Sequence, residues 1–388
     1  MRIGCLFFIL LAGCGARSHA DDDDTTLGDG DADADTDADT DTDADGDSDC
    51  AGLPAPTSVD MLVLVDNSSS MAQEQANLTQ NFGLLLEALT APTDFNGDGV
   101  LDPAVESLHL GVISTDMGTG GFAVQTCRDA VDGDDGILRN QASGSVAGCD
   151  DQYPLFLSLE EGDDPERVSE DFSCIATLGT GGCGFEQHLK AVHKALTVHR
   201  DGANAGFLRD DSLLSILIVT DEEDCSVRED IANGTDIFNT QLALGPLNLR
   251  CYNHRDQYVE TVDAFVDELL ALRPCPDRHL AVAGIVGIPP GMRHACNLAN
   301  MTDADYQCLL DLPDMQEVID NSAEGKGERL TPSCDEAGLG EAFPPRRIVE
   351  FVRQLGNQGA TSSVHSICEA DLRMGQIGDE LRRALSGN

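Results

Sequence analysis

The chain has 388 residues, which is enough for one large domain or two ordinary ones. It carries 70 acidic side chains against 23 basic ones, so its formal net charge is −47, and it contains no tryptophan. A charge of this sign and size repels nucleic-acid phosphates and anionic lipid headgroups, so neither is an expected partner. It favours divalent cations or basic protein surfaces instead.

The first residues have the pattern of an export signal. Arg2 precedes an apolar run from Cys5 to Ala12, which is too short to span a bilayer. The run ends in Leu11-Ala12-Gly13-Cys14, which is typical of a bacterial lipobox. We therefore expect a signal peptide over residues 1–13 and a lipidated Cys14, which would place the protein in the bacterial cell envelope, at the outer membrane or cell surface. An ordinary signal peptide cut nearby is the alternative.

Residues 14–53 are predicted to be the lipidated N-terminus and a disordered linker. Within them, residues 21–49 hold 15 aspartates and no basic residue. Residues 28–49 of this tract have no apolar side chain larger than alanine and cannot form a core, and their like charges keep them extended. Its D-x-D-x-D-G pattern is similar to the start of an EF-hand loop, but it lacks the regular turn glycine and the distal glutamate. The tract is therefore expected to act as a spacer between the membrane and the domain.

From residue 54 onward, apolar runs of strand length alternate with segments of helical periodicity. In chain order, the pattern predicts a strand at 59–65, a helix at 70–89, a strand at 108–114, a helix at 185–198, a strand at 213–219, a helix at 258–272, a strand at 279–286, a helix at 345–355, a short strand at 362–367 and a helix at 370–385. Unbroken apolar strands that alternate with helices indicate an α/β fold with a mostly parallel, doubly wound sheet that carries helices on both faces. Insertions are expected near 115–180, 225–257 and 288–344.

The loop between the first helix and the second strand contains a possible calcium motif. It has the form D-x-N-x-D-G-x-x-D, and its expected ligands are Asp94, Asn96, Asp98, the carbonyl of Val100 and Asp102. The twelfth position is Val105, and Glu106 comes one residue too late for the usual bidentate ligand. A polar turn without a metal is the alternative.

Twelve cysteines remain after the signal peptide and the lipidated residue. They are Cys50, Cys127, Cys149, Cys174, Cys183, Cys225, Cys251, Cys275, Cys296, Cys308, Cys334 and Cys368. An even number in an exported chain predicts disulfides, whereas a zinc site would need closer pairs. The sequence leaves the pairing open, although Cys174–Cys183 and Cys296–Cys308 are plausible local bonds.

Oxygen-bearing side chains follow two of the predicted strands. Asp66, Ser68 and Ser70 alternate directly after the first strand, and Asp221 follows the strand at 213–219. In an open doubly wound sheet, ligands bind beyond the carboxyl ends of the strands. Carboxylates and hydroxyls are the hard ligands that Mg²⁺ or Mn²⁺ prefers. The alternative role for the D-x-S-x-S segment is to cap the helix that follows.

Together these motifs resemble the von Willebrand factor A (VWFA) domain family. Asp66-x-Ser68-x-Ser70 is similar to its metal-ion-dependent adhesion site (MIDAS), and Asp221 is similar to its later aspartate. The resemblance covers residues 57–386 and implies that a threonine in the loop before the third main helix completes the site. Thr180 is the only hydroxyl in the tip of that loop, and Cys183 is the alternative occupant of the threonine position. Glu222 stands where the family usually has glycine.

The resemblance implies metal-mediated protein binding, in which a partner's acidic side chain fills an open position on the cation. The expected function is therefore divalent-cation-dependent adhesion, not catalysis. The sequence has no H-E-x-x-H and no G-x-S-x-G motif, which would indicate a zinc protease or a serine hydrolase. Two alternatives are a structural envelope lipoprotein with a vestigial metal site and a metal-dependent hydrolase, and the latter would need a base and anchoring cations near Asp66.

Overall fold

The structure is a computed structural model of the chain. The structure describes residues 50, 54–95, 97–102, 104–143, 146–291, 296–298, 301–322 and 327–386. The predicted signal peptide, Cys14, nearly all of the linker and Asn96 lie outside these residues. The chain divides into two units, Met1–Ala51 and Gly52–Asn388, and the elements below belong to the second. In the described residues, no helix is both long and apolar enough to cross a membrane.

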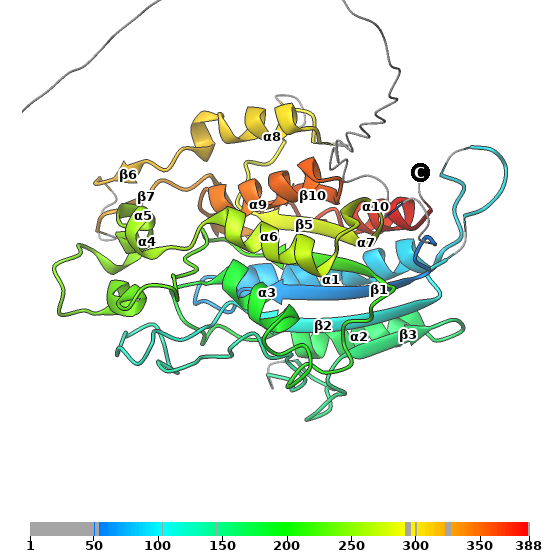
Figure 1. Cartoon of the computed structure of the whole chain (residues 1–388), viewed down its shortest axis with the longest axis horizontal. Coiled ribbons are helices and arrows are strands. Elements are labelled where there is room, and N and C mark those ends of the chain that lie inside the picture. Colours follow the sequence, from blue (N-terminus) through cyan, green and yellow to red (C-terminus); the bar gives the residue numbers. More distant parts are fainter. Residues whose placement is uncertain are drawn as a thin grey trace, which may run out of the picture. The chain divides into compact units, whose positions relative to one another are not determined.

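A six-stranded sheet forms the centre of the second unit (Figure 1). In spatial order its strands are β10 (Thr361–Ser366), β5 (Leu280–Val286), β4 (Leu213–Val219), β1 (Ser58–Val65), β2 (Ser107–Ser114) and β3 (Leu157–Glu160). All neighbouring pairs are parallel except β2 and β3. The predicted α/β fold with a mostly parallel sheet is therefore confirmed. The last residue of β1, Val65, lies beside Ser114 of β2 and Val219 of β4, so three strands end at the same edge.

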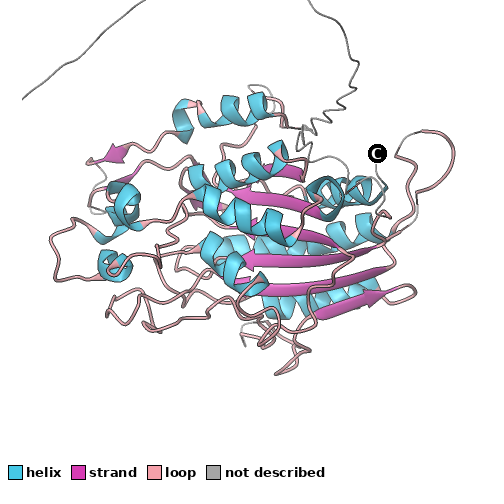
Figure 2. Ribbon diagram, viewed as in Figure 1, coloured by secondary structure: helices cyan, strands magenta, loops and turns pink. Residues whose placement is uncertain are grey.

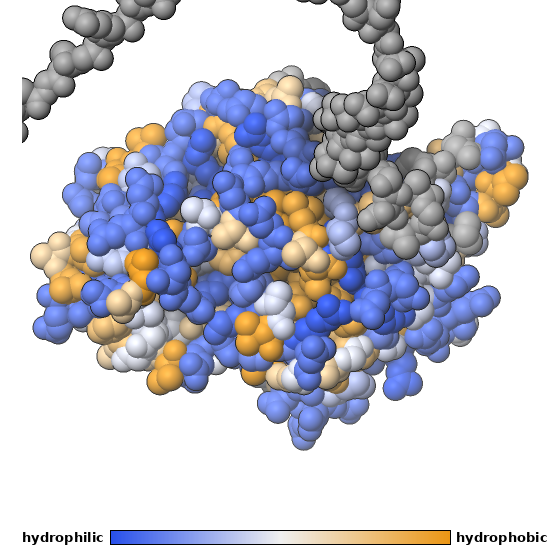
Figure 3. Space-filling view, viewed as in Figure 1, coloured by the Kyte–Doolittle hydropathy of each residue, from blue (hydrophilic) through white to orange (hydrophobic). Residues whose placement is uncertain are grey.

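Helices cover both faces of this sheet (Figure 2). On one face lie α1 (Ala72–Thr90), α2 (Pro165–Ala176) and α10 (Met374–Ser386), and on the other lie α3 (His188–Leu196), α6 (Val262–Leu272) and α9 (Arg346–Asn357). Successive strand residues point to opposite faces, so Val63 and Val65 pack in the first layer and Leu62 and Leu64 in the second. Because both layers are apolar, the inner strands are apolar throughout, as the sequence indicates. The face of the domain shown in Figure 3 is mostly hydrophilic.

The three predicted insertions contain more regular structure than expected. The segment 115–180 contains β3 and α2, and α2 is capped by Asp164 and packs Phe172 against Phe82 of α1 with ring centroids 3.5 Å apart. The segment 225–257 forms two 3₁₀ turns (Gly234–Phe238 and Leu247–Leu249) and the one-turn helix α4 (Arg250–Asn253), and α5 (Arg255–Tyr258) follows. A further short helix, α7 (Pro276–His279), precedes β5. The last insertion holds α8 (Asp303–Leu310), a 3₁₀ turn (Pro313–Met315) and two small hairpins, β6 (Ile319–Asp320) with β7 (Arg329–Leu330) and β8 (Cys334–Glu336) with β9 (Gly340–Ala342).

All twelve cysteines from Cys50 to Cys368 are disulfide-bonded, as predicted from their even number. Five pairs join Cys127 to Cys183, Cys149 to Cys174, Cys225 to Cys251, Cys296 to Cys308 and Cys334 to Cys368. The local bond Cys296–Cys308 is thus confirmed, whereas Cys174–Cys183 is wrong. Cys174 lies on α2 and bonds the loop before β3, while Cys183 belongs to the loop before α3 and bonds the loop after β2.

Candidate functional site

Asp66 lies directly after β1 and is fully buried. Its backbone N–H donates to Val219 O of β4 at 3.0 Å, which joins the two strand ends. Its Oδ1 accepts hydrogen bonds from Ser68 N (2.7 Å) and Thr115 Oγ1 (3.3 Å), and its Oδ2 accepts one from Thr220 Oγ1 (2.7 Å). The carboxylate is therefore held in a fixed orientation by three elements.

Asp221 follows β4 and is also fully buried. Neither of its carboxylate oxygens has a hydrogen-bond partner among the described residues. Burial and then the charges of Asp66 and Glu222 raise the pKa of Asp221 well above its usual value. The Ser70 hydroxyl lies near enough to offset part of this rise, although the geometry is not that of a hydrogen bond. The structure thus brings Asp66, Ser70 and Asp221 together, as the sequence predicts.

The remaining hydroxyls of the predicted site have different environments. Ser68 is buried, and its Oγ lies 3.1 Å from Ser70 Oγ. Thr180 is exposed and lines a cavity together with Asn67 and Gly182. Cys183, the alternative to Thr180, is bonded to Cys127 and has no thiol to offer a cation.

Three glutamates enlarge the acidic group around Asp66 and Asp221. Burial and then the nearby Asp66 raise the pKa of Glu186 well above its usual value and that of Glu222 to about 8. Burial also raises the pKa of Glu74, and the charge of Asp66 adds to the rise. Glu186 and Glu74 are not among the sequence-predicted site residues. The only signal for Glu186 is a lone acid in the glycine-rich loop that precedes α3.

A hairpin covers this group of carboxylates. Phe343 N, just after β9, donates to Asp221 O at 2.8 Å. Gly340 of β9 has a φ of +104°, and a Cβ at this position would collide with Oε1 of Glu74. The Cys334–Cys368 disulfide ties the hairpin to the segment after β10. Asp66 and Asp221 are therefore buried, because part of the insertion at 288–344 packs over the sheet edge, whereas Ser70 is exposed.

A buried network supports the site from behind. His188 Nε2 lies 2.8 Å from Thr220 Oγ1, the hydroxyl that donates to Asp66. The other ring nitrogen of His188 lies 3.7 Å from Asp224, too far for a hydrogen bond, and Asp224 accepts a hydrogen bond from Arg347 Nε at 3.1 Å. These contacts connect the end of β4 to the starts of α3 and α9, so they hold the carboxylates of Asp66 and Asp221 in position.

The donor set fits Mg²⁺ or Mn²⁺. In the described segments, no cluster of three or more His, Cys, Asp or Glu side chains is arranged to hold a metal ion by itself. The predicted site does not need such a cluster, since it combines two carboxylates with serine hydroxyls. The two unpartnered oxygens of Asp221 are the observation that fits a cation, because a buried carboxylate without a partner is unfavourable.

The predicted calcium loop forms a closed turn. Asp94 accepts hydrogen bonds from Gly97 N (2.7 Å) and Gly99 N (2.9 Å), and Asp102 Oδ2 accepts one from Phe95 N (3.0 Å). Asp98 Oδ1 accepts from the N–H of Val100 at 2.7 Å. These bonds define a polar turn, and calcium binding at Asp94, Asp98, Val100 and Asp102 stays a prediction.

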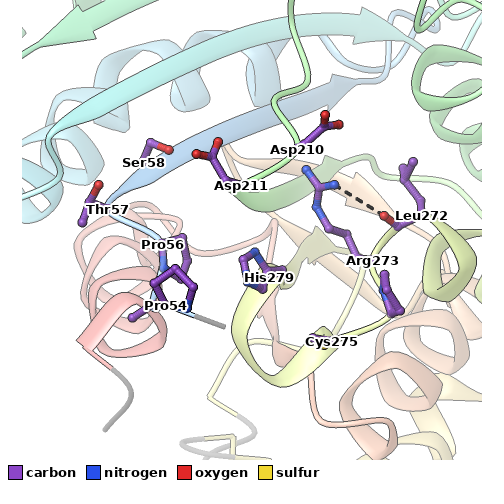
Figure 4. Close-up of a pocket in the computed structure, with 12 residues that line it drawn as sticks. Pro54, Pro56, Thr57, Ser58, Asp210, Asp211, Leu272, Arg273, Cys275 and His279 are labelled. Carbon is purple, nitrogen blue, oxygen red and sulfur yellow. Dashed lines mark hydrogen bonds between the residues drawn. The ribbon is translucent and has the colours of Figure 1, made fainter. Parts of the chain in front are cut away.

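A second cavity of about 450 Å³ lies at the amino ends of the strands, at the other edge of the sheet from Asp66 (Figure 4). It is lined by Ser58 of β1, Asp211, Arg273 and His279, among others. His279 Nδ1 lies 3.3 Å from Ser212 O, before β4. The cavity is thus separate from the carboxylate site.

Comparisons with known proteins assign no family. No family model matches the chain, and no curated protein matches it. A solved structure of proximal thread matrix protein 1 from the mussel byssus (crystal form 2) is 12% identical, with a TM-score of 0.27. The match covers 61% of this chain and 40% of the mussel protein. This likeness is too small to carry an argument about fold or function.

Proposed function

We propose that residues 54–388 form a doubly wound VWFA-like domain that binds a protein partner through a divalent cation. The strand order supports this proposal, because β1 lies between β2 and β4 and the chain proceeds outward in both directions. Such a reversal leaves a crevice at the carboxyl ends of the strands, where open α/β sheets bind ligands. Asp66 and Asp221 follow the two strands that meet there.

The observation that carries the proposal is the buried, unpartnered carboxylate of Asp221 beside Asp66. Two like charges in a poorly solvated place repel each other, and a cation between them would remove this repulsion. Asp66, Ser68, Ser70 and Asp221 would hold Mg²⁺ or Mn²⁺. When bound, the cation would supply an open position for a carboxylate of the partner, which would give cation-dependent adhesion at the cell envelope.

Glu186 would favour the cation through its charge, and Thr180 is the candidate for a further ligand. We expect Glu186→Gln to weaken Mn²⁺ binding about tenfold or more, because Glu186 is buried next to Asp66 and Asp221. We expect Thr180→Ala to leave Mn²⁺ binding unchanged, because Thr180 is exposed. Titration calorimetry of Mn²⁺ into the wild type and both variants measures this.

A loss of affinity in Thr180→Ala alone would instead make the threonine the ligand that completes the site. If the wild type binds neither Mg²⁺ nor Mn²⁺ at millimolar concentration, the adhesion proposal fails. The protein would then be a structural envelope lipoprotein with a vestigial site.

The lipobox leads to a separate proposal, that the domain is held at the membrane by acyl chains on Cys14 alone. Cys14→Ser should move the protein from the membrane fraction to the soluble or unprocessed fraction. Fractionation of cells followed by intact mass measurement checks this. Unchanged processing and partitioning in the variant would rule out the anchor.

A further inference from the structure

A polar cavity of about 430 Å³ lies beside the candidate cation site, and we name it the Arg128 cleft. Asn67, which directly follows Asp66, lines one part of it, and the loop Leu178–Gly182 lines another. Gly182 N donates to Asn67 O at 2.8 Å, so the loop is attached to the segment that carries Asp66. The cleft and the cation site therefore share this segment.

Two adjacent glycines make room for the side chains that line the cleft. A Cβ at Gly181 would lie 2.5 Å from Nη1 of Arg128, and one at Gly182 would collide with Oδ1 of Asn67. The Arg128 guanidinium and the Asn67 amide thus lie against neighbouring residues of the same loop. The Oδ1 of Asn67 is also buried without a hydrogen-bond partner in the described structure. These contacts place a cationic side chain next to the segment of the proposed cation site.

Arg128 differs from nearly all other arginines and lysines in the part of the domain that the structure describes. Of the arginines and lysines that the structure describes, all but Arg128 and Arg167 have an ion pair, a hydrogen bond or a ring contact. The other arginine in the cleft, Arg139, is paired with Asp134 at 2.7 Å. An exposed, unpaired guanidinium in so acidic a domain is available for an anion from outside.

We propose that the Arg128 cleft binds a second carboxylate of the partner. One acidic side chain would fill the open position on the cation, and a neighbouring one would pair with Arg128, so this inference rests on the proposed function. The planar guanidinium pairs with a carboxylate through two parallel hydrogen bonds. Asp116 and Asp129 also line the cleft, and their charges would repel a phosphate dianion more strongly than a single carboxylate. The partner segment is therefore one with two nearby Asp or Glu residues.

The test uses full-length protein loaded with Mn²⁺ and blocked glycine peptides as probes. One peptide carries a single aspartate, and the others carry a second aspartate at increasing spacings. At one spacing the second aspartate should raise affinity on the order of tenfold, because a charge-assisted pair is added. The variant R128Q should lose this gain, while its affinities for Mn²⁺ and for the peptide with one aspartate stay unchanged. Calorimetry measures all of these affinities.

The matched control is R167Q, which removes the same charge from the exposed Arg167 on α2. It should keep the full gain from the second aspartate. If the peptide with one aspartate binds but no second aspartate adds affinity, the role of Arg128 is disproved and the cation-dependent function stands. If Mn²⁺ does not bind, the proposed function fails. In that case the peptides with two aspartates are measured in EDTA. Binding that R128Q abolishes would still support carboxylate binding in the Arg128 cleft. If these peptides do not bind in EDTA, carboxylate binding in the cleft is disproved.

Discussion

Replacing Asp221 with asparagine should abolish Mg²⁺ and Mn²⁺ binding and should also stabilise the cation-free protein at neutral pH. The loss of binding follows because asparagine removes one of the two carboxylates that would hold the cation. The gain in stability follows because the wild-type carboxylate is buried without a partner beside Asp66 and Glu222. An unsatisfied buried polar group costs about 1–3 kcal/mol, and part of that cost disappears with the charge. Calorimetry and urea unfolding in EDTA measure the two effects.

Asp66→Asn is the matched comparison, because it removes the other carboxylate from the same site. It should also abolish cation binding, but it should destabilise the cation-free protein. Asp66 accepts hydrogen bonds from Ser68, Thr115 and Thr220, and an asparagine cannot accept from all three. If Asp221→Asn also lowered the stability in EDTA, Asp221 would have a structural partner, and the argument for a cation at this position would lose its main support.

The two aspartates could be predicted from the sequence because their positions depend on local patterns. Each comes at the end of an apolar run of strand length, and the carboxyl ends of parallel strands meet at one edge. The same patterns predict the central strands, because residues buried on both faces must be apolar throughout. Helix starts were less accurate: the helix expected at 258–272 begins at Val262, where Thr261 caps it.

The parts of the site that sequence patterns missed depend on contacts between distant segments. Glu186 lies beside Asp66 because the loop before α3 is fixed by the Cys127–Cys183 disulfide and by the hydrogen bond from Gln187 N to Thr115 O. The β8–β9 hairpin, which packs against Glu74, comes more than 250 residues later in the chain. Neither feature has a periodic signal, and disulfide pairing cannot be deduced from cysteine positions alone. The helix α2 did carry ordinary signals, a cap at Asp164 followed by Pro165, but it lies within the insertion near 115–180, for which no helix was predicted.

The largest loss of stability is expected from Asp224→Asn. Burial alone would raise the pKa of Asp224, but the nearby His188 ring and the charge of Arg347 outweigh it and hold the pKa far below its usual value. The carboxylate also accepts hydrogen bonds from Leu189 N (3.0 Å) and Ser226 Oγ (2.6 Å). Removing its charge takes away the carboxylate that pairs with the Nε of the buried Arg347, which should cost about 3–5 kcal/mol of the free energy of unfolding. Urea unfolding at neutral pH measures this.

The effect of pH gives the prediction a second, independent readout. Because the pKa of Asp224 is lower in the folded state than in the unfolded chain, its contribution is present in full above the unfolded value of about 3.9. That contribution is lost as the pH falls towards the folded value, so the stability difference between wild type and Asp224→Asn should shrink below about pH 4. Asp256→Asn, at an exposed position on α5, is the control and should change stability by less than about 0.5 kcal/mol at any of these pH values. If the difference in the free energy of unfolding between wild type and Asp224→Asn stays constant with pH, packing and not the ion pair with Arg347 stabilises this buried network.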